Sequence, residues 1–227
     1  MKITAMIPAR LGSKRIPQKN LRILDGKPLI QHAIDIAKEA NVFSEIIVNS
    51  ESDAIGELAL SSGIGFYKRP AELSTDTATN NNFTADFLKN HDCDFVVMLN
   101  STSPLLSSET VVRFIQFIEK NSFDTVLSVK EIQTEIIFQD KPLNFNYKKK
   151  INSQGIEPVY SLAWALTAWR KTLFLSYFNE GKCGTFCGKV GNFTIPESEA
   201  YDIDTEEDWK MVEAQFIRQR EAVRVDA

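Results

Sequence analysis

The chain has 227 residues, of which 43% are hydrophobic and 25% are charged. These values are typical of a soluble globular protein and argue against a disordered chain, and the length suits one α/β domain. The formal net charge of −4 argues against a general nucleic-acid-binding protein, because such proteins neutralise phosphates with a basic surface. We therefore expect one domain over residues 1–227 that has no nucleic acid as a partner.

The cysteines and the apolar segments favour the cytoplasm. Cys93, Cys183 and Cys187 are odd in number, so they do not predict a disulfide framework. The apolar run at residues 3–7 is too short for a signal peptide. No run approaches the ~18 apolar residues that cross a bilayer. We expect a cytoplasmic protein that has no membrane as a partner.

Apolar runs alternate with helical periods over the first 130 residues. The runs typical of buried strands are residues 3–7, 46–48, 95–99 and 125–129. Helices are expected after Pro28, between Asp53 as N-cap and Gly63, and across Val111 to Ile118. Strands that alternate with helices in this way predict a mostly parallel sheet with helices on both faces.

The regular pattern stops after residue 130. Residues 131–158 are polar and irregular, which predicts an arm, a lid or a dimerisation element. Regular signals return at residues 159–167. A helix is expected near residues 169–178 and a strand at 193–195. The last helix should follow Asp204, where Thr205 and Asp208 have the spacing of a capping box.

A basic loop at residues 8–20 follows the first predicted strand. Ligands of parallel α/β sheets bind at the carboxyl ends of the strands. Arg10 can hold a phosphate bidentately, and Lys14 and Lys19 can act as point charges. Gly12 allows close approach of the backbone, and Ser13 adds a hydroxyl donor. These residues predict a site for a triphosphate; the alternative is a solvated basic loop.

Asp202 and Asp204 are separated by one residue just before the last helix. On extended backbone their carboxylates point the same way and can share one cation, for which Mg²⁺ is the best match. Asp204 can instead be only the N-cap of the helix, and Asp202 only a surface charge.

Two further polar segments are candidates for contact with the substrates. Asn100, Thr102 and Ser103 follow the predicted strand at 95–99, at the same edge of the sheet as the basic loop. Residues 68–80 form a loop that leads into a helix and can contact a base or ribose. Both segments also have plain structural uses as turns.

Taken together, these segments resemble the acylneuraminate cytidylyltransferases, the CMP–sialic acid synthetases. The match is longest at Ile-Pro-Ala-Arg-x-Gly-Ser-Lys-x-Ile-Pro-x-Lys-Asn, residues 7–20. Shorter matches lie at residues 26–30, 69–73, 76–78, 102–105 and 202–205. The resemblance is weakest from about residue 131 to residue 185.

The resemblance implies a Rossmann-like nucleotidyltransferase fold with a dimerisation extension at residues 131–165, and hence a homodimer. It implies that CTP and a sialic-acid-like sugar give the CMP-sugar and pyrophosphate, with Mg²⁺ held by Asp202 and Asp204. Arg10, Ser13 and Lys19 would hold the phosphates, and Asn20, Arg69 and Asn80 would lie near the nucleoside. Arg10 and Lys19 would then be catalytic through charge neutralisation, with Asp202 as the suspected base.

The acceptor half departs from the family pattern. The family turn Gln-Pro-Thr-Ser-Pro-Leu-Arg is replaced by residues 100–106, which begin with Asn100 and end with Leu106. Residues 159–163 lack a family Arg and Asn, so the acceptor need not be N-acetylneuraminate. Three alternatives stay open: a cytidylyltransferase for Kdo or a phosphonate, a glycosyltransferase whose D-x-D metal site is Asp202 and Asp204, and a non-catalytic nucleotide-binding protein.

Overall fold

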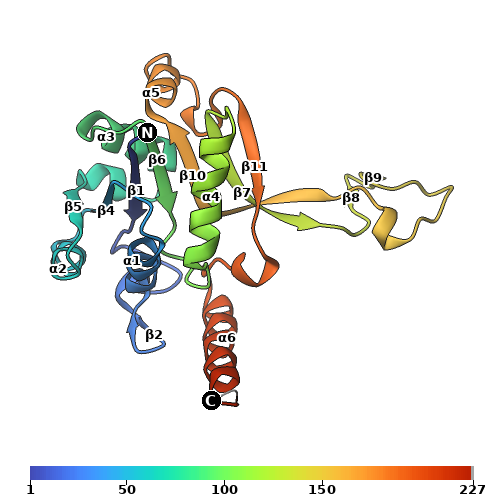
Figure 1. Ribbon diagram of the computed structural model, residues 1–227, viewed down its shortest axis with the longest axis horizontal. Coiled ribbons are helices and arrows are strands. Elements are labelled where there is room, and N and C mark those ends of the chain that lie inside the picture. The colour runs from blue at the N-terminus through green and yellow to red at the C-terminus, as the bar shows by residue number, and fades with distance from the viewer. Residues whose placement is uncertain (226–227) are drawn as a thin grey trace.

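The computed structural model describes residues 1–225 and contains a seven-stranded sheet of order β11-β7-β10-β6-β1-β4-β5 (Figure 1). Its strands are β1 (Ile3–Pro8), β4 (Glu45–Ser50), β5 (Gly65–Lys68), β6 (Phe95–Leu99), β7 (Thr125–Ile132), β10 (Val159–Arg170) and β11 (Val190–Thr194). β10 runs antiparallel to β6 and β7, and the other neighbouring strands are parallel. The prediction of a mostly parallel sheet is therefore confirmed.

Helices cover both faces of this sheet. They are α1 (Leu29–Ala40), α2 (Asp53–Ser61), α3 (Asn80–Asn90), α4 (Ser108–Lys120), α5 (Lys171–Asn179) and α6 (Glu206–Val225). In β6, Phe95, Val97 and Leu99 pack with residues of α1, α2 and α4, while Val96 and Met98 pack with residues of α3 and α5. Successive side chains of a strand point to opposite faces, so a strand that is covered on both faces has an unbroken apolar sequence.

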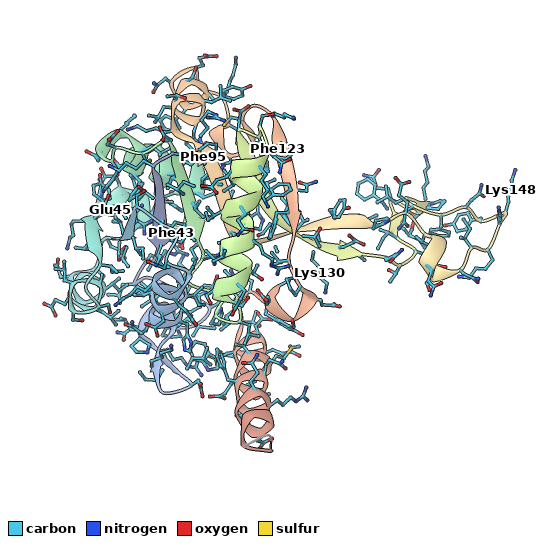
Figure 2. All side chains as sticks on the ribbon, viewed as in Figure 1. Phe43, Glu45, Phe95, Phe123, Lys130 and Lys148 are labelled. Carbon is cyan, nitrogen blue, oxygen red and sulfur yellow. The ribbon has the colours of Figure 1, made fainter. Side chains whose placement is uncertain are left out.

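Residues 131–158 form an arm that projects from the body (Figure 1). The arm extends the antiparallel pair of β7 and β10 and carries the short hairpin of β8 (Ile137–Phe138) and β9 (Lys141–Pro142). Figure 2 shows Lys148 near its tip. The register of the pair shifts between Leu162 and Thr167, and Trp164 has a φ of 56° in this irregular stretch. The irregular segment is therefore an arm, one of the three forms expected.

Several expected element boundaries were wrong. The helix expected near 169–178 begins only at Lys171, because Trp169 belongs to β10 and packs in the core. Ser52, not Asp53, is the N-cap of α2, and its side chain accepts a hydrogen bond from the N–H of Ile55. β5 was not predicted, since it has only four residues and is only partly buried. The strand expected at 193–195 spans Val190–Thr194.

Short elements connect these layers. They are β2 (Ile23–Leu24), β3 (Lys27–Pro28) and the 3-10 helices η1 (Lys19–Leu21), η2 (Ala71–Ser74), η3 (Ser153–Gly155), η4 (Gly184–Phe186) and η5 (Glu197–Glu199).

The start of α6 confirms the expected capping box. The N–H of Thr205 donates to Asp208 Oδ2 at 2.7 Å, and the N–H of Asp208 donates to Thr205 Oγ1 at 3.2 Å. Trp209, in the first turns of the helix, is buried together with Ile16 and Ile203. This cluster attaches the loop after β1 to the segment before α6, so residues far apart in sequence lie side by side.

Candidate active site

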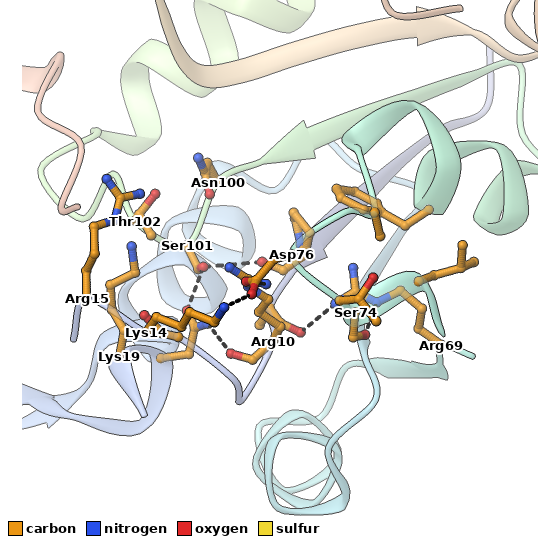
Figure 3. Close-up of a pocket in the computed structure, with 18 of the residues that line it drawn as sticks. Arg10, Lys14, Arg15, Lys19, Arg69, Ser74, Asp76, Asn100, Ser101 and Thr102 are labelled. Atoms are coloured by element: carbon orange, nitrogen blue, oxygen red, sulfur yellow. Dashed lines mark hydrogen bonds and ion pairs between the residues drawn. The ribbon is translucent and has the colours of Figure 1, made fainter. Parts of the chain in front are cut away.

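A cavity of about 530 Å³ lies at the carboxyl ends of β1 and β6 (Figure 3). Its lining comes from four segments of the chain and is mostly polar or charged. The lining residues are Pro8, Ala9, Arg10, Ser13, Lys14, Arg15, Lys19, Asn20, Arg69, Leu73, Ser74, Thr75, Asp76, Ala78, Phe83, Asn100, Ser101, Thr102 and Asp204. This size and polarity suit a small charged ligand.

The loop after β1, residues 9–20, is held in place by a buried side chain and by hydrogen bonds to neighbouring segments. Ile16 is fully buried in the apolar cluster beside α6. The Asn20 side chain donates to the carbonyl oxygen of Arg10 at 3.0 Å and accepts from Ser101 Oγ at 2.8 Å. Glu51 Oε1 accepts from the N–H of Leu11 at 2.8 Å. The charged side chains of the loop therefore start from a positioned backbone.

Four cations of this loop are paired with two carboxylates. Arg10 Nη1 lies 2.8 Å from Asp76 Oδ1, and Lys14 Nζ contacts Asp76 Oδ2. Arg15 Nη2 lies 2.9 Å from Asp204 Oδ1. Lys19 Nζ lies 3.4 Å from the same Asp204 oxygen. Each carboxylate thus bridges two cations that are four residues apart in the loop.

Arg69 lines the cavity but is only 4% exposed. Its Nε donates to Ser74 Oγ at 2.9 Å and its Nη2 donates to the carbonyl oxygen of Ala9 at 3.2 Å. Burial lowers the pKa of Arg69, and the nearby Glu51 carboxylate opposes that shift. For Glu51, burial acts to raise the pKa, but the hydrogen bond from Leu11 and the charge of Arg69 leave it lowered. This pair ties the basic loop to β4 and β5.

Asp202 and Asp204 flank the buried Ile203, as expected for alternating side chains. Asp202 is exposed as a residue, but its carboxyl group accepts a hydrogen bond from Thr102. Burial of this group raises the pKa of Asp202, the bond from Thr102 lowers it, and the Asp204 carboxylate raises it. Two neighbouring carboxylates, one of them with a raised pKa, are a donor set that fits a divalent cation.

The helix-cap interpretation of Asp204 is wrong. Thr205 occupies the cap position, and the backbone N–H of Asp204 donates to Asp208 Oδ2 at 3.1 Å. The carboxylate of Asp204 is directed instead to Arg15 and Lys19, at the edge of the cavity.

Most of the residues singled out from the sequence line the cavity, but four do not. Those that line it are Arg10, Ser13, Lys14, Lys19, Asn20, Arg69, Asn100, Thr102 and Asp204. Gly12, Asn80, Ser103 and Asp202 are outside the lining. Ser103 is 1% exposed and its hydroxyl faces the interior, while Asn80 is the first residue of α3.

Leu106 is not part of the site. It is 3% exposed and packs with α4 residues in the main core, so its side chain does not line the cavity.

Four residues of the site had no role in the sequence-based prediction. Arg15, Glu51, Asp76 and Ser101 each bond to a predicted residue. Asp76 lies in one of the family-like segments, and Arg15 lies in the basic loop itself, so both had a local signal. Ser101 lies in the polar turn after the strand at 95–99, so it had a local signal too. Glu51 had none, because its partner is set by strand order.

Among residues 1–225, no helix is long and apolar enough to cross a membrane. The same residues contain no group of three or more His, Cys, Asp or Glu side chains that could hold a metal ion. A cation at Asp202 and Asp204 would therefore take its other ligands from water and from substrate oxygens.

Residues 4–211 match the model of the family described as cytidylyltransferase. An N-acylneuraminate cytidylyltransferase of Streptococcus agalactiae serotype III is 31% identical over an alignment of 219 residues that covers 92% of this chain and 52% of that protein. The chain thus spans about half the length of this curated relative. A CMP-N,N'-diacetyllegionaminic acid synthase of Legionella pneumophila is 31% identical over 248 residues, covering 98% of this chain and 100% of that protein.

The fold is shared with solved structures. A CMP:2-keto-3-deoxy-manno-octonic acid synthetase complexed with CTP superposes with a TM-score of 0.71 at 16% identity, covering 96% of this chain and 100% of that one. A 4-diphosphocytidyl-2C-methyl-D-erythritol synthase from Anaerococcus prevotii has a TM-score of 0.68 at 18% identity, covering 95% and 98%. At these identities the likeness concerns the fold alone.

Proposed function

The chain belongs to the cytidylyltransferase family, and from this premise we propose that it couples CTP to a sialic-acid-like nonulosonic sugar, giving the CMP-sugar and pyrophosphate. One observation carries the proposal: Arg10, Lys14, Arg15 and Lys19 converge on one cavity at the carboxyl ends of parallel strands. A site with this charge suits a triphosphate better than the diphosphate of a nucleotide-sugar donor.

The reaction needs little covalent chemistry from the protein. The anomeric hydroxyl of the sugar would attack the α-phosphorus of CTP, and pyrophosphate would leave. Arg10 and Lys19 would neutralise charge that builds up on the phosphates, which is the main way in which such transfers are accelerated. The fixed loop backbone keeps these cations in position before the substrate arrives, which reduces the ordering cost.

Asn20 and Arg69 are proposed to hold neighbouring segments of the site in place. Asn20 is 5% exposed and links the loop to Ser101, so it fixes the turn after β6 against the phosphate site. Arg69 braces the loop backbone at Ala9 and stacks over the ring of Phe83 at 5.0 Å. Ser13 and Lys14 are proposed phosphate contacts, with Gly12 leaving open space beside the backbone.

Asp202 and Asp204 are proposed to hold Mg²⁺. The bound ion would neutralise phosphate charge and orient the reacting oxygens. To bind the ion, the Asp204 carboxylate would have to give up part of its contact with Arg15 and Lys19. Asp202 is also the suspected proton acceptor for the sugar hydroxyl, because it is bonded to Thr102 of the cavity lining, where the acceptor is proposed to enter.

The acceptor is proposed to enter beside Asn100 and Thr102, which line the cavity next to Asp204. Ser103 was expected to help, but its buried hydroxyl gives it no access to this space.

We also propose that two chains associate through the arm, in the cytoplasm. The arm and the adjacent start of β10 expose large apolar side chains to water in a single copy: Ile137, Phe138, Leu143, Tyr147, Tyr160 and Leu162. Light scattering should give twice the chain mass. Phe138→Ser with Leu143→Ser should shift it toward one chain, and a wild-type protein with the mass of one chain would contradict the dimer.

The activity itself is tested by pyrophosphate release. Folded protein is incubated with CTP, Mg²⁺ and a panel of nonulosonic acids, Kdo and phosphonates. Release with a nonulosonic acid is expected. Release with only Kdo or a phosphonate would reassign the acceptor, and no release with any acceptor would refute the proposed activity.

A further inference from the structure

Asp76 lies in the exposed loop between η2 and α3, and its carboxylate points toward Arg10 and Lys14 (Figure 3). One oxygen, Oδ1, lies 2.8 Å from Arg10 Nη1, and the other contacts Lys14 Nζ. The carboxylate thus bridges two cations of the loop that we propose binds phosphates. Arginine and lysine side chains that hold two carboxylate oxygens in this way can hold two oxygens of a phosphate group instead.

The rest of the Asp76 loop is bonded mainly to itself. Thr75 Oγ1 donates to the carbonyl oxygen of Glu72 at 3.2 Å, and Thr79 forms a capping box with Asn82. Within the part of the chain that the structure describes, the side-chain links from residues 75–79 to the basic loop are the two ion pairs of Asp76. Breaking those pairs would release the loop without unfolding any element.

The three charged groups are also open to water. The side chains of Arg10, Lys14 and Asp76 are 37%, 79% and 44% exposed. Exposed ion pairs contribute little, and a ligand with several negative charges competes strongly for the same cations. Lys14 and Arg10 lower the pKa of Asp76, so its carboxylate stays charged at neutral pH and competes in turn.

We propose that Asp76 is a displaceable counter-ion of the phosphate site, which leaves Arg10 and Lys14 when a polyphosphate binds and returns when pyrophosphate departs. This inference rests on the proposed function, because that function supplies the two polyphosphates. Asp76 would then weaken binding of CTP and pyrophosphate alike, and would favour release of the product. It is a positioning residue, since it acts through the two cations.

Titration calorimetry with inorganic pyrophosphate, and separately with CTP, tests the proposal. Asp76→Asn keeps the size of the side chain and removes its charge. We expect the variant to bind both polyphosphates about fivefold more tightly, the scale set by exposed ion pairs. Under turnover, pyrophosphate should inhibit the variant at correspondingly lower concentrations.

Two control variants separate displacement from other effects. Glu72→Gln removes the same charge from the same segment, at a carboxylate with no ion pair among the described residues. Asp92→Asn breaks a pair with Lys2 at the opposite edge of the sheet. Both should bind pyrophosphate as the wild type does, and thermal unfolding should show that all three variants fold.

The outcomes are distinct. Unchanged or weaker binding by Asp76→Asn would overturn the inference, as would equal tightening by Glu72→Gln, which would indicate a general charge effect. If the wild type binds CTP but Asp76→Asn does not bind it more tightly, this inference fails and the proposed function stands. If neither the wild type nor the variant binds CTP or pyrophosphate, both proposals fail.

Discussion

The ammonium group of Lys19 donates a hydrogen bond of 2.5 Å to the backbone carbonyl oxygen of Ile203, a residue 184 positions later in the chain. Lys19 is therefore more than a charge on a loop, because it also anchors the segment that carries Asp202 and Asp204. Its side chain is only 11% exposed. Its ammonium group also lies 3.4 Å from Asp204 Oδ1, and the residue lines the cavity. The basic loop and the segment that carries the two carboxylates are thus held together as one unit.

Asp204→Asn should lower the rate of pyrophosphate release at least about a hundredfold while the protein stays folded. The reason is that Asp204 faces Arg15 and Lys19 rather than capping α6. Thr205→Ala is the matched control. It should lower the free energy of unfolding by about 1 kcal/mol and leave the activity of the folded protein largely intact. An Asp204→Asn protein that loses stability but keeps its activity would contradict this assignment.

Gly12→Ala should leave the free energy of unfolding within about 0.5 kcal/mol of the wild type, because a Cβ at Gly12 meets no atom within 4 Å. If the backbone at Gly12 approaches the triphosphate, the added methyl group should weaken CTP binding about tenfold, or about 1.4 kcal/mol. Calorimetry and thermal unfolding on one preparation measure both quantities. Unchanged CTP affinity would remove Gly12 from the nucleotide site.

Arg69→Met should destabilise the protein by about 2 kcal/mol, measured by chemical denaturation. The substitution leaves Glu51 without its cation and Ala9 O without its donor. The cost is below that of a fully buried pair because the Glu51 side chain is 21% exposed. Adding Glu51→Gln should recover part of the loss. A double variant that is as unstable as the sum of the two single variants would show that the two residues are not coupled.

Asn100→Gln should change the choice of acceptor rather than the use of CTP. The Asn100 side chain lines the cavity, while its N–H is held by Ala165 O at 3.0 Å, so a longer amide would extend into the space proposed for the sugar. We expect the ratio of kcat/KM between two nonulosonic acids to shift about tenfold, with the KM for CTP unchanged. A parallel change for every acceptor would indicate a general loss of geometry.

Acidification should weaken the fold through His32. This side chain is 4% exposed, its Nε2 lies 2.9 Å from Leu24 O, and its ring contacts Phe216 of α6. Burial lowers the pKa of His32 below 6.5. The unfolded chain therefore takes up a proton before the folded one, and the free energy of unfolding falls as the pH drops below about 6.5.

Chemical denaturation between pH 7 and pH 5.5 measures this effect. His32→Gln should show a smaller fall over the same range, and His91→Gln controls for the loss of an imidazole elsewhere. Parallel curves for His32→Gln and the wild type would exclude His32 as the source.

Much of the fold could be read from local pattern. The apolar run of β6, the stripe of α4 and the capping box of α6 each depend on residues within a few positions of one another. The wrong start of the helix near Trp169 has the same origin. From local pattern alone, an apolar residue next to a helix resembles part of that helix, and only the pairing with the neighbouring strands shows that Trp169 belongs to β10. Leu106 is a similar case: only the packing of α4 shows that it belongs to the core.

By itself, then, the sequence determined the alternation of strands and helices and the position of the basic loop after the first strand, since both follow from short-range periodicity. Tertiary structure alone decided which charges meet: Arg10 with Asp76, Lys19 with Ile203 and Asp204, and Arg69 with Glu51. These partners come from different strand ends, and only the order of strands in the sheet brings those ends to one cavity. Side-chain charge states then depend on the burial that results, and no single segment specifies that burial.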